Sequence, residues 1–157
     1  MSNFLVLYAS VTGNTELMAN AVVNYLKQYD HNHNVDIKEF DVDKINVRDL
    51  PNYDAVLLGV YTWTDGELPF EVEDFYDELD DIDMTGVACG VFGSGDQFYD
   101  VFCGAVDIMY ERMEEIGAAM IPIKVKADLD PNEEEAKQCK ELAESVIRTV
   151  SQMNVVL

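Results

Sequence analysis

The chain has 157 residues, of which 48% are hydrophobic, enough for one well-buried core and too few for two ordinary domains. Its 31 acidic residues against 10 basic ones give a formal net charge of −21, which argues against binding to nucleic acid or to an anionic membrane. The negative charge could attract a protein partner that carries a basic patch, or it could serve solubility alone. We expect a single domain over residues 1–157.

The N-terminal segment predicts that the protein stays in the cytoplasm. Its short apolar run, Phe4–Tyr8, lacks the basic start and the length of a signal peptide or a membrane span. Cys89, Cys103 and Cys139 have neither CxxC nor Cys/His ligand spacing, so we expect reduced thiols and no metal centre.

Strand-like and helix-like patterns alternate along the whole chain. In chain order they predict a strand at 4–8, a helix at 14–28, strands at 35–40 and 55–60, a helix at 70–79, a strand at 87–92, a helix at 105–116, a strand at 121–126 and a helix at 131–151. The last helix has the clearest start signal. Asp130 is its expected N-cap, Pro131 takes the first helical position and Glu133 reaches back as in a capping box.

The strand patterns are of two kinds, which predicts their places in a sheet. The first, third and fourth are continuous apolar runs, typical of parallel strands covered by helices on both faces. The second and fifth alternate apolar with polar residues, and Pro122 lacks the N–H that a central strand needs, so these two are expected at the edges. The pattern agrees with a doubly wound, three-layer α/β/α fold whose five-stranded parallel sheet has the order 2-1-3-4-5. Ligands of such sheets bind at the carboxyl ends of the strands, here between the first and third.

A turn rich in hydroxyl groups follows the first strand and opens directly into a helix. It reads Ser10-Val11-Thr12-Gly13-Asn14-Thr15. Its three hydroxyls, the amide of Asn14 and the backbone N–H groups around Gly13 can surround a phosphate without any basic side chain. The turn lacks the lysine of a nucleotide triphosphatase loop and the GxGxxG of a dinucleotide fold, so a phosphate monoester is the expected ligand. Helix capping alone would also account for such a turn.

Two further loops should reach the same end of the sheet. The loop after the third strand carries Thr62-Trp63-Thr64, and the loop after the fourth carries Ser94-Gly95-Asp96 and Tyr99. Each loop thus presents an aromatic side chain, and two aromatic rings beside a phosphate turn can sandwich a flat ring system. Backbone groups of the second loop would then meet the polar edge of that ring.

These segments resemble the flavodoxin family along the whole chain. The run Val6–Val22 fits the family signature, and Thr62-Trp63 and Gly95-Asp96 through Asp107 fit two further family segments. The fifth strand leads directly to its helix without a long insertion, so the resemblance is to short-chain flavodoxins.

The resemblance implies FMN as a non-covalently bound cofactor and assigns roles to eight of the site residues. Trp63 would lie against the inner face of the flavin ring and Tyr99 against the outer face. Asp96 and Cys103 would contact the pyrimidine edge, mainly through their backbone. The FMN phosphate would be held by four side chains of the turn: Ser10, Thr12, Asn14 and Thr15.

The resemblance further implies a low-potential electron carrier and not an enzyme. It would pass single electrons, as a monomer, between a flavodoxin reductase or another donor and acceptor enzymes with basic docking patches. The reduced flavin, negatively charged in this family, would lie among acidic side chains that disfavour the second electron: Asp65, Glu67, Asp96 and Asp100. The acidic run 77–83 fits a docking surface and a merely solvated face equally well.

Two other functions are open to a chain of this topology. A signalling receiver domain needs an acceptor Asp at the end of the third strand and an acidic pair after the first, whereas this chain has Val60-Tyr61 and Ala9-Ser10 there. An FMN-dependent NAD(P)H:quinone reductase needs a larger substrate pocket, and no insertion is present to build one. Both are therefore less well supported than the carrier.

Overall fold

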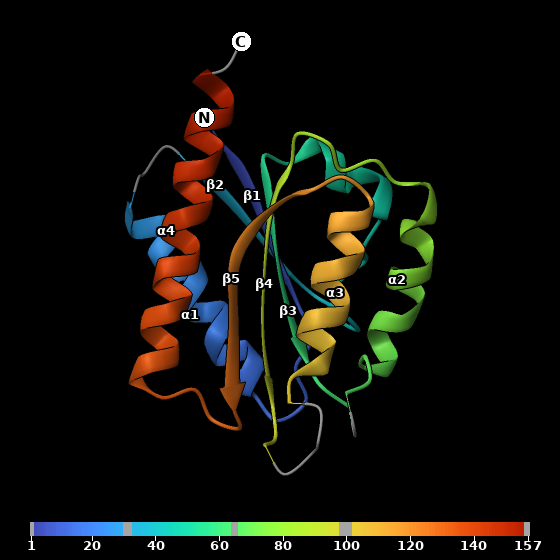
Figure 1. Ribbon diagram of the computed structural model, residues 1–157, viewed down its shortest axis with the longest axis vertical. Coiled ribbons are helices and arrows are strands. Elements are labelled where there is room, and N and C mark those ends of the chain that lie inside the picture. The colour runs from blue at the N-terminus through green and yellow to red at the C-terminus, as the bar shows by residue number, and fades with distance from the viewer. Residues whose placement is uncertain (1, 30–32, 64–65, 98–101, 156–157) are drawn as a thin grey trace.

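The computed structural model describes residues 2–29, 33–63, 66–97 and 102–155 (Figure 1). Its elements alternate between strands and helices, with short 3-10 helices (η) around the third strand. In chain order they are β1 (Asn3–Tyr8), α1 (Asn14–Tyr29), β2 (Asn34–Glu39), η1 (Val47–Asn52), β3 (Ala55–Tyr61), η2 (Phe70–Val72), α2 (Glu73–Glu78), η3 (Leu79–Asp81), β4 (Ala88–Gly95), α3 (Gly104–Glu115), β5 (Ala119–Asp128) and α4 (Glu133–Val155).

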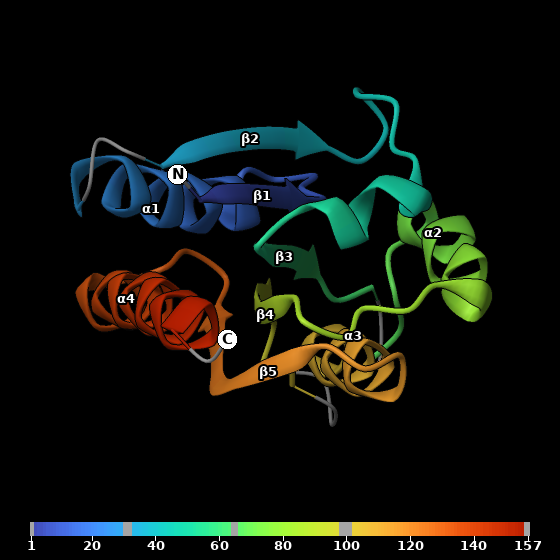
Figure 2. The same ribbon diagram turned by 90° about the horizontal axis from the view of Figure 1, so that it is seen from above.

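The strands form one parallel sheet in the order β2-β1-β3-β4-β5, which confirms the predicted order and the predicted edges. Helices α1 and α4 cover one face and α2 and α3 cover the other (Figure 2). The register between β4 and β5 shifts after Cys89, which pairs with Met120, while Val91 pairs with Lys124. Pro122 lies in the extra stretch of β5 and is exposed, so its missing N–H costs no central hydrogen bond.

Alternation along the strands divides the core into two layers. Phe4 and Val6 of β1 pack towards α1 and α4, whereas Leu5 and Leu7 pack towards α2 and α3. Because both faces are covered, every second residue is as deeply buried as its neighbours, which explains the continuous apolar runs of β1, β3 and β4.

Two expectations about the helices were wrong in detail. The helix α4 begins at Glu133, and its N-cap is Asn132 instead of Asp130. Asn132 Oδ1 accepts from the N–H of Glu135 at 3.1 Å, and its carbonyl accepts from Ala136 at 3.0 Å. The side chain of Asn132 thus satisfies one of the free N–H groups of the first turn, and Pro131 stays outside the helix.

The segment predicted as one helix over 70–79 is instead η2, α2 and η3 in succession. Arg112 of α3, 9% exposed, fixes this segment from the side. Its guanidinium donates to the carbonyl of Tyr76 at 3.0 Å and forms an ion pair with Asp80. Part of the acidic run therefore has a structural role, since Asp80 holds η3 against α3.

Candidate functional site

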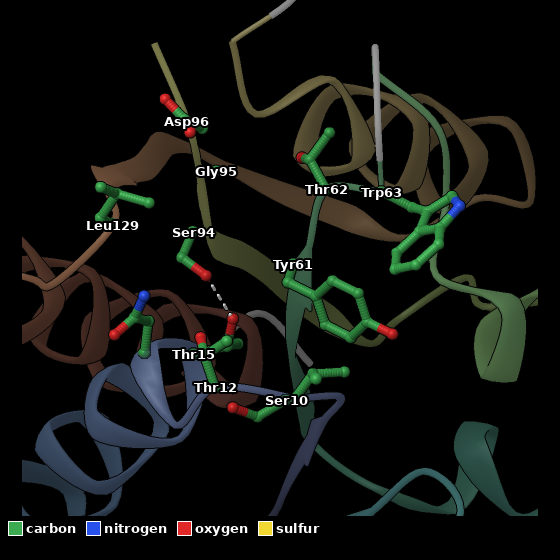
Figure 3. Close-up of a pocket in the computed structure, with 12 residues that line it drawn as sticks. Ser10, Thr12, Thr15, Tyr61, Thr62, Trp63, Ser94, Gly95, Asp96 and Leu129 are labelled. Atoms are coloured by element: carbon green, nitrogen blue, oxygen red, sulfur yellow. Dashed lines mark hydrogen bonds between the residues drawn. The ribbon is translucent and has the colours of Figure 1, made fainter. Parts of the chain in front are cut away.

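A pocket of about 290 Å³ opens at the carboxyl ends of β1, β3 and β4 (Figure 3). This is the end of the sheet where the doubly wound order predicts a ligand, and no described residue in the lining has a basic side chain. The lining consists of Ser10, Val11, Thr12, Asn14, Thr15, Tyr61, Thr62, Trp63, Ser94, Gly95, Asp96 and Leu129.

The turn between β1 and α1 wraps around the hydroxyl of Ser10. Its Oγ accepts from the N–H groups of Gly13 at 3.2 Å and Glu16 at 3.3 Å. Gly13 has a φ of +93°, a conformation that strains other residues, and its carbonyl accepts from Leu17 as the first bond of α1. The N-terminus of α1 thus faces the pocket with its positive dipole end, which favours an anion.

A buried hydrogen bond connects this turn to β4. Thr15 Oγ1 and Ser94 Oγ lie 2.8 Å apart, and both side chains are buried (Figure 3). Thr15 comes from the first turn of α1 and Ser94 from the carboxyl end of β4. This bond fixes the turn between β1 and α1 relative to the carboxyl end of β4.

The segment after β3 folds back on itself around Trp63. The backbone N–H of Trp63 donates to the carbonyl of Glu67 at 2.8 Å, and the backbone N–H of Glu67 donates to the carbonyl of Trp63 at 2.9 Å. Gly66 inside this pair has a φ of +96°, which glycine adopts without strain. The indole of Trp63 remains 54% exposed at the rim of the pocket, where it can lie against a planar ligand.

Thr62 connects the same segment to α3. Its Oγ1 accepts from the N–H of Ala105 at 3.3 Å. Cys103, the N-cap residue of α3, makes no cap hydrogen bond with its own side chain, so a hydroxyl from another loop supplies the cap.

The end of β4 packs directly over Cys103. A Cβ on Gly95 would lie 2.9 Å from Cys103 Sγ, so a glycine is needed for this approach. The thiol itself is fully buried and points towards the carbonyl of Ala127 at 3.6 Å, and burial raises its pKa to about 12. Cys103 therefore packs behind Gly95, which lines the pocket. Contact of the Cys103 backbone with a ligand stays a prediction.

The end of β5 also contributes to the site, which the sequence did not indicate. Leu129 N–H donates to the carbonyl of Gly95 at 2.8 Å, and Asp128 Oδ1 accepts from the N–H of Gln97 at 3.1 Å. Leu129 lines the pocket with a φ of +57°. Its position at the carboxyl end of a strand was the signal that could have identified it.

Tyr61 is the second lining residue that the sequence reasoning did not include. It is the last residue of β3 and stands directly before the Thr62-Trp63 pair. Its phenol points away from Thr15 and Ser94, on the Trp63 side of the pocket, and donates to Glu71 Oε2 at 2.9 Å (Figure 3).

The structure brings most of the predicted site residues into one pocket. Gly13 and Cys103 lie behind the lining and shape it. Thr64 and Tyr99 lie outside the described residues, as do the acidic residues Asp65 and Asp100. Those that line the pocket are Ser10, Val11, Thr12, Asn14, Thr15, Thr62, Trp63, Ser94, Gly95 and Asp96.

The described residues form neither a metal centre nor a disulfide. No group of His, Cys, Asp and Glu residues there could hold a metal ion. Cys89, Cys103 and Cys139 are free and buried. None of the helices, as far as the structure describes them, has the length and apolar character of a bilayer-spanning segment.

Comparison with known proteins agrees with this geometry. The flavodoxin family model matches residues 6–142. Probable flavodoxin 1 of Bacillus subtilis (strain 168) is 36% identical over 98% of this chain and 96% of its own. The crystal structure of oxidised flavodoxin 1 from Bacillus cereus superposes with a TM-score of 0.88 at 35% identity, covering 94% of this chain and 98% of that one.

A further solved structure, that of a short-chain flavodoxin associated with a non-canonical PDU bacterial microcompartment, has a TM-score of 0.88 at 36% identity. It covers 96% of this chain and 99% of the other. With the family model matching most of the chain and relatives of similar length covering nearly all of it, the chain belongs to the flavodoxin family of FMN-binding electron-transfer proteins.

Proposed function

We propose that this chain is a low-potential electron carrier that holds one FMN and passes single electrons between a reductase, or another donor, and acceptor enzymes. The observation that carries the proposal is the pocket itself. It combines a ring of hydroxyl and N–H groups at the N-terminus of α1 with an exposed indole, and its described lining has no basic side chain. Such a lining suits a phosphate joined to a planar, redox-active ring.

The residues of the pocket divide into three tasks. Ser10, Thr12, Asn14 and Thr15 hold the phosphate, aided by the dipole of α1. Trp63 covers one face of the flavin ring, and its Glu67 partner fixes the backbone that presents the indole. The backbone of Ser94, Gly95 and Asp96 meets the polar edge of the ring, and Thr64, Tyr99 and Cys103 complete the proposed set. FMN supplies the redox chemistry when it is bound, and the protein determines which of its charge states is favoured.

The test of this function is reconstitution. The purified chain, stripped of bound cofactor, is titrated with FMN while the visible spectrum and flavin fluorescence are recorded. We expect one equivalent to bind, with quenched fluorescence and a perturbed yellow spectrum. A protein that stays colourless at all FMN concentrations would overturn the function and leave the fold intact.

The proposed partners are redox proteins with basic patches, and the proposed working unit is a cytoplasmic monomer. A net charge of −21 makes copies of the chain repel each other and attracts basic proteins. The buried free thiols suit a reducing compartment. The acidic run 77–83 contributes to this field, although Asp80 is also engaged by Arg112.

Electron transfer to a basic partner should slow as ionic strength rises. The Debye length falls from about 30 Å at 0.01 M salt to about 8 Å at 0.15 M, which screens the attraction between the partners. The rate is measured by stopped flow with the reduced holoprotein and a basic cytochrome, and a small neutral oxidant serves as the control whose rate should hold. If the rate with the cytochrome were equal at low and high salt, electrostatic steering would be ruled out.

A further inference from the structure

Two sets of contacts hold the segment that presents Trp63. The inner set is the backbone pair between Trp63 and Glu67. The outer contact is the hydrogen bond from the phenol of Tyr61 to the carboxylate of Glu71, at 2.9 Å. Tyr61 is the last residue of β3, and Glu71 lies in η2, the next helical element along the chain.

We propose that the Tyr61–Glu71 hydrogen bond is a positioning contact that fixes the Trp63 segment in its ligand-ready conformation and thereby sets the affinity for the flavin. This inference rests on the proposed function and assigns part of its binding strength to a pair outside the phosphate turn. Tyr61 also lines the pocket, so the same residue shapes the cavity and holds the segment.

Both partners stand on fixed parts of the structure. Tyr61 continues a strand whose residues Leu58 and Val60 are fully buried, and Glu71 directly precedes Val72, which is fully buried as well. The hydrogen bond thus joins two anchored points at the base of the segment 62–70. Joining them shortens the loop that must be ordered and reduces the conformational entropy lost when a ligand binds.

The phenol of Tyr61 stays protonated, and so able to donate, further into the alkaline range than an ordinary tyrosine. Burial of Tyr61, then its hydrogen bond to Glu71 and the nearby negative charges of Glu71 and Asp41, raise the pKa of the phenol. The phenol therefore remains a donor, and the carboxylate acceptor makes this a charge-assisted bond. Such bonds are about twice as strong as those between neutral groups.

The chain offers its own probe and its own control. Trp63 is the sole tryptophan, so tryptophan fluorescence reports on this segment alone, with or without FMN. Tyr53, shortly before β3, donates to Asp36 at 2.8 Å, and burial followed by that hydrogen bond raises its pKa to about 12. The two tyrosine–carboxylate pairs are alike, but the Tyr53 pair lies at the opposite end of the strand from the pocket.

The experiment compares Tyr61→Phe, Glu71→Ala and Glu71→Gln with the control Tyr53→Phe. In the cofactor-free proteins, acrylamide quenching of Trp63 should increase for Tyr61→Phe and Glu71→Ala. The Kd for FMN should rise about tenfold in the same two variants. Glu71→Gln, which keeps an oxygen acceptor for the phenol, should stay within about threefold of the unsubstituted protein. Tyr53→Phe should change neither quenching nor Kd.

The outcomes separate this inference from the proposed function. Unchanged quenching and unchanged Kd in Tyr61→Phe would overturn the positioning role. Equal effects in Tyr61→Phe and Tyr53→Phe would overturn it too, because a general loss of stability would then be the cause. If the unsubstituted protein failed to bind FMN, the proposed function would fail, and the quenching of Trp63 would still decide whether the pair orders the segment.

Discussion

Replacing Thr12 with aspartate should weaken FMN binding by about a hundredfold or more without unfolding the protein. Thr12 is exposed and lines the pocket at the N-terminus of α1. A carboxylate there would face the phosphate of FMN at close range, and two like charges about 5 Å apart repel by roughly 3 kcal/mol at an effective dielectric constant of about 20. The measurement is an FMN titration followed by flavin fluorescence.

The same change should leave the cofactor-free protein at least as stable as before. An acidic side chain at a helix N-terminus interacts favourably with the helix dipole, so thermal unfolding should show no loss. Unfolding of the variant at a much lower temperature would contradict this expectation, because the weak binding could then result from a damaged fold.

Three controls show whether the phosphate is the group that is repelled. Thr12→Asn introduces a neutral side chain of the same size as aspartate, and this variant should bind FMN with a Kd within a few-fold of that of the unsubstituted protein. Asn20→Asp adds the same charge at an exposed position further along α1 and should have little effect. Riboflavin, which lacks the phosphate, should bind the Thr12→Asp variant as it binds the unsubstituted protein. An equal loss of riboflavin would place the phosphate elsewhere.

The architecture was predictable because burial determines it strand by strand. A strand covered on both faces needs apolar residues at every position, and β1, β3 and β4 show this in their sequences. Pro122, which lacks an N–H, indicates in the sequence that β5 is an edge strand, and in the structure it lies where the register between β4 and β5 shifts. The end of a helix is decided by one or two local hydrogen bonds, which is why the prediction placed the N-cap at Asp130, two residues before the Asn132 that caps the helix.

The site was predictable where it follows from topology and was missed where it depends on tertiary contacts. Loops after β1, β3 and β4 were expected to converge, and the pocket confirms this. The sequence placed Tyr61 just after the third strand without a role in the site, because nothing in the local sequence shows that its phenol meets Glu71. The packing of Cys103 under Gly95 likewise joins residues whose contact no local pattern predicts.

Three basic residues of the described chain are engaged by acidic side chains that do not line the pocket. Arg112 is paired with Asp80, and Lys124 and Lys126 both contact Asp107, at 3.0 and 2.7 Å. These cations therefore compensate acidic groups elsewhere, and the described lining of the pocket contains none of them. A negative charge added to the bound cofactor would be opposed by acidic neighbours, and the described lining offers no cation to offset them.

The second one-electron potential of bound FMN should consequently lie well below that of free FMN. Each 1.4 kcal/mol of repulsion lowers a one-electron potential by about 59 mV, so a few carboxylates near the ring are enough. Glu67 and Asp96 are the described acidic residues proposed to act here, since Glu67 pairs with Trp63 and Asp96 lines the pocket. Spectroelectrochemical titration of the holoprotein measures the potential directly.

Neutralising either residue should raise that potential. We expect Glu67→Gln and Asp96→Asn each to raise it by roughly 30 to 60 mV, because one repulsive charge is removed in each variant. Glu67 takes part in the Trp63 pair through its backbone, so the glutamine variant keeps that contact. Glu114→Gln serves as the matched control, because this exposed residue lies in the last turns of α3, away from the pocket. A shift as large in the control as in the other two would mean that net charge alone sets the potential. A second potential close to that of free FMN in the unsubstituted protein would show that the acidic neighbours do not control the redox state.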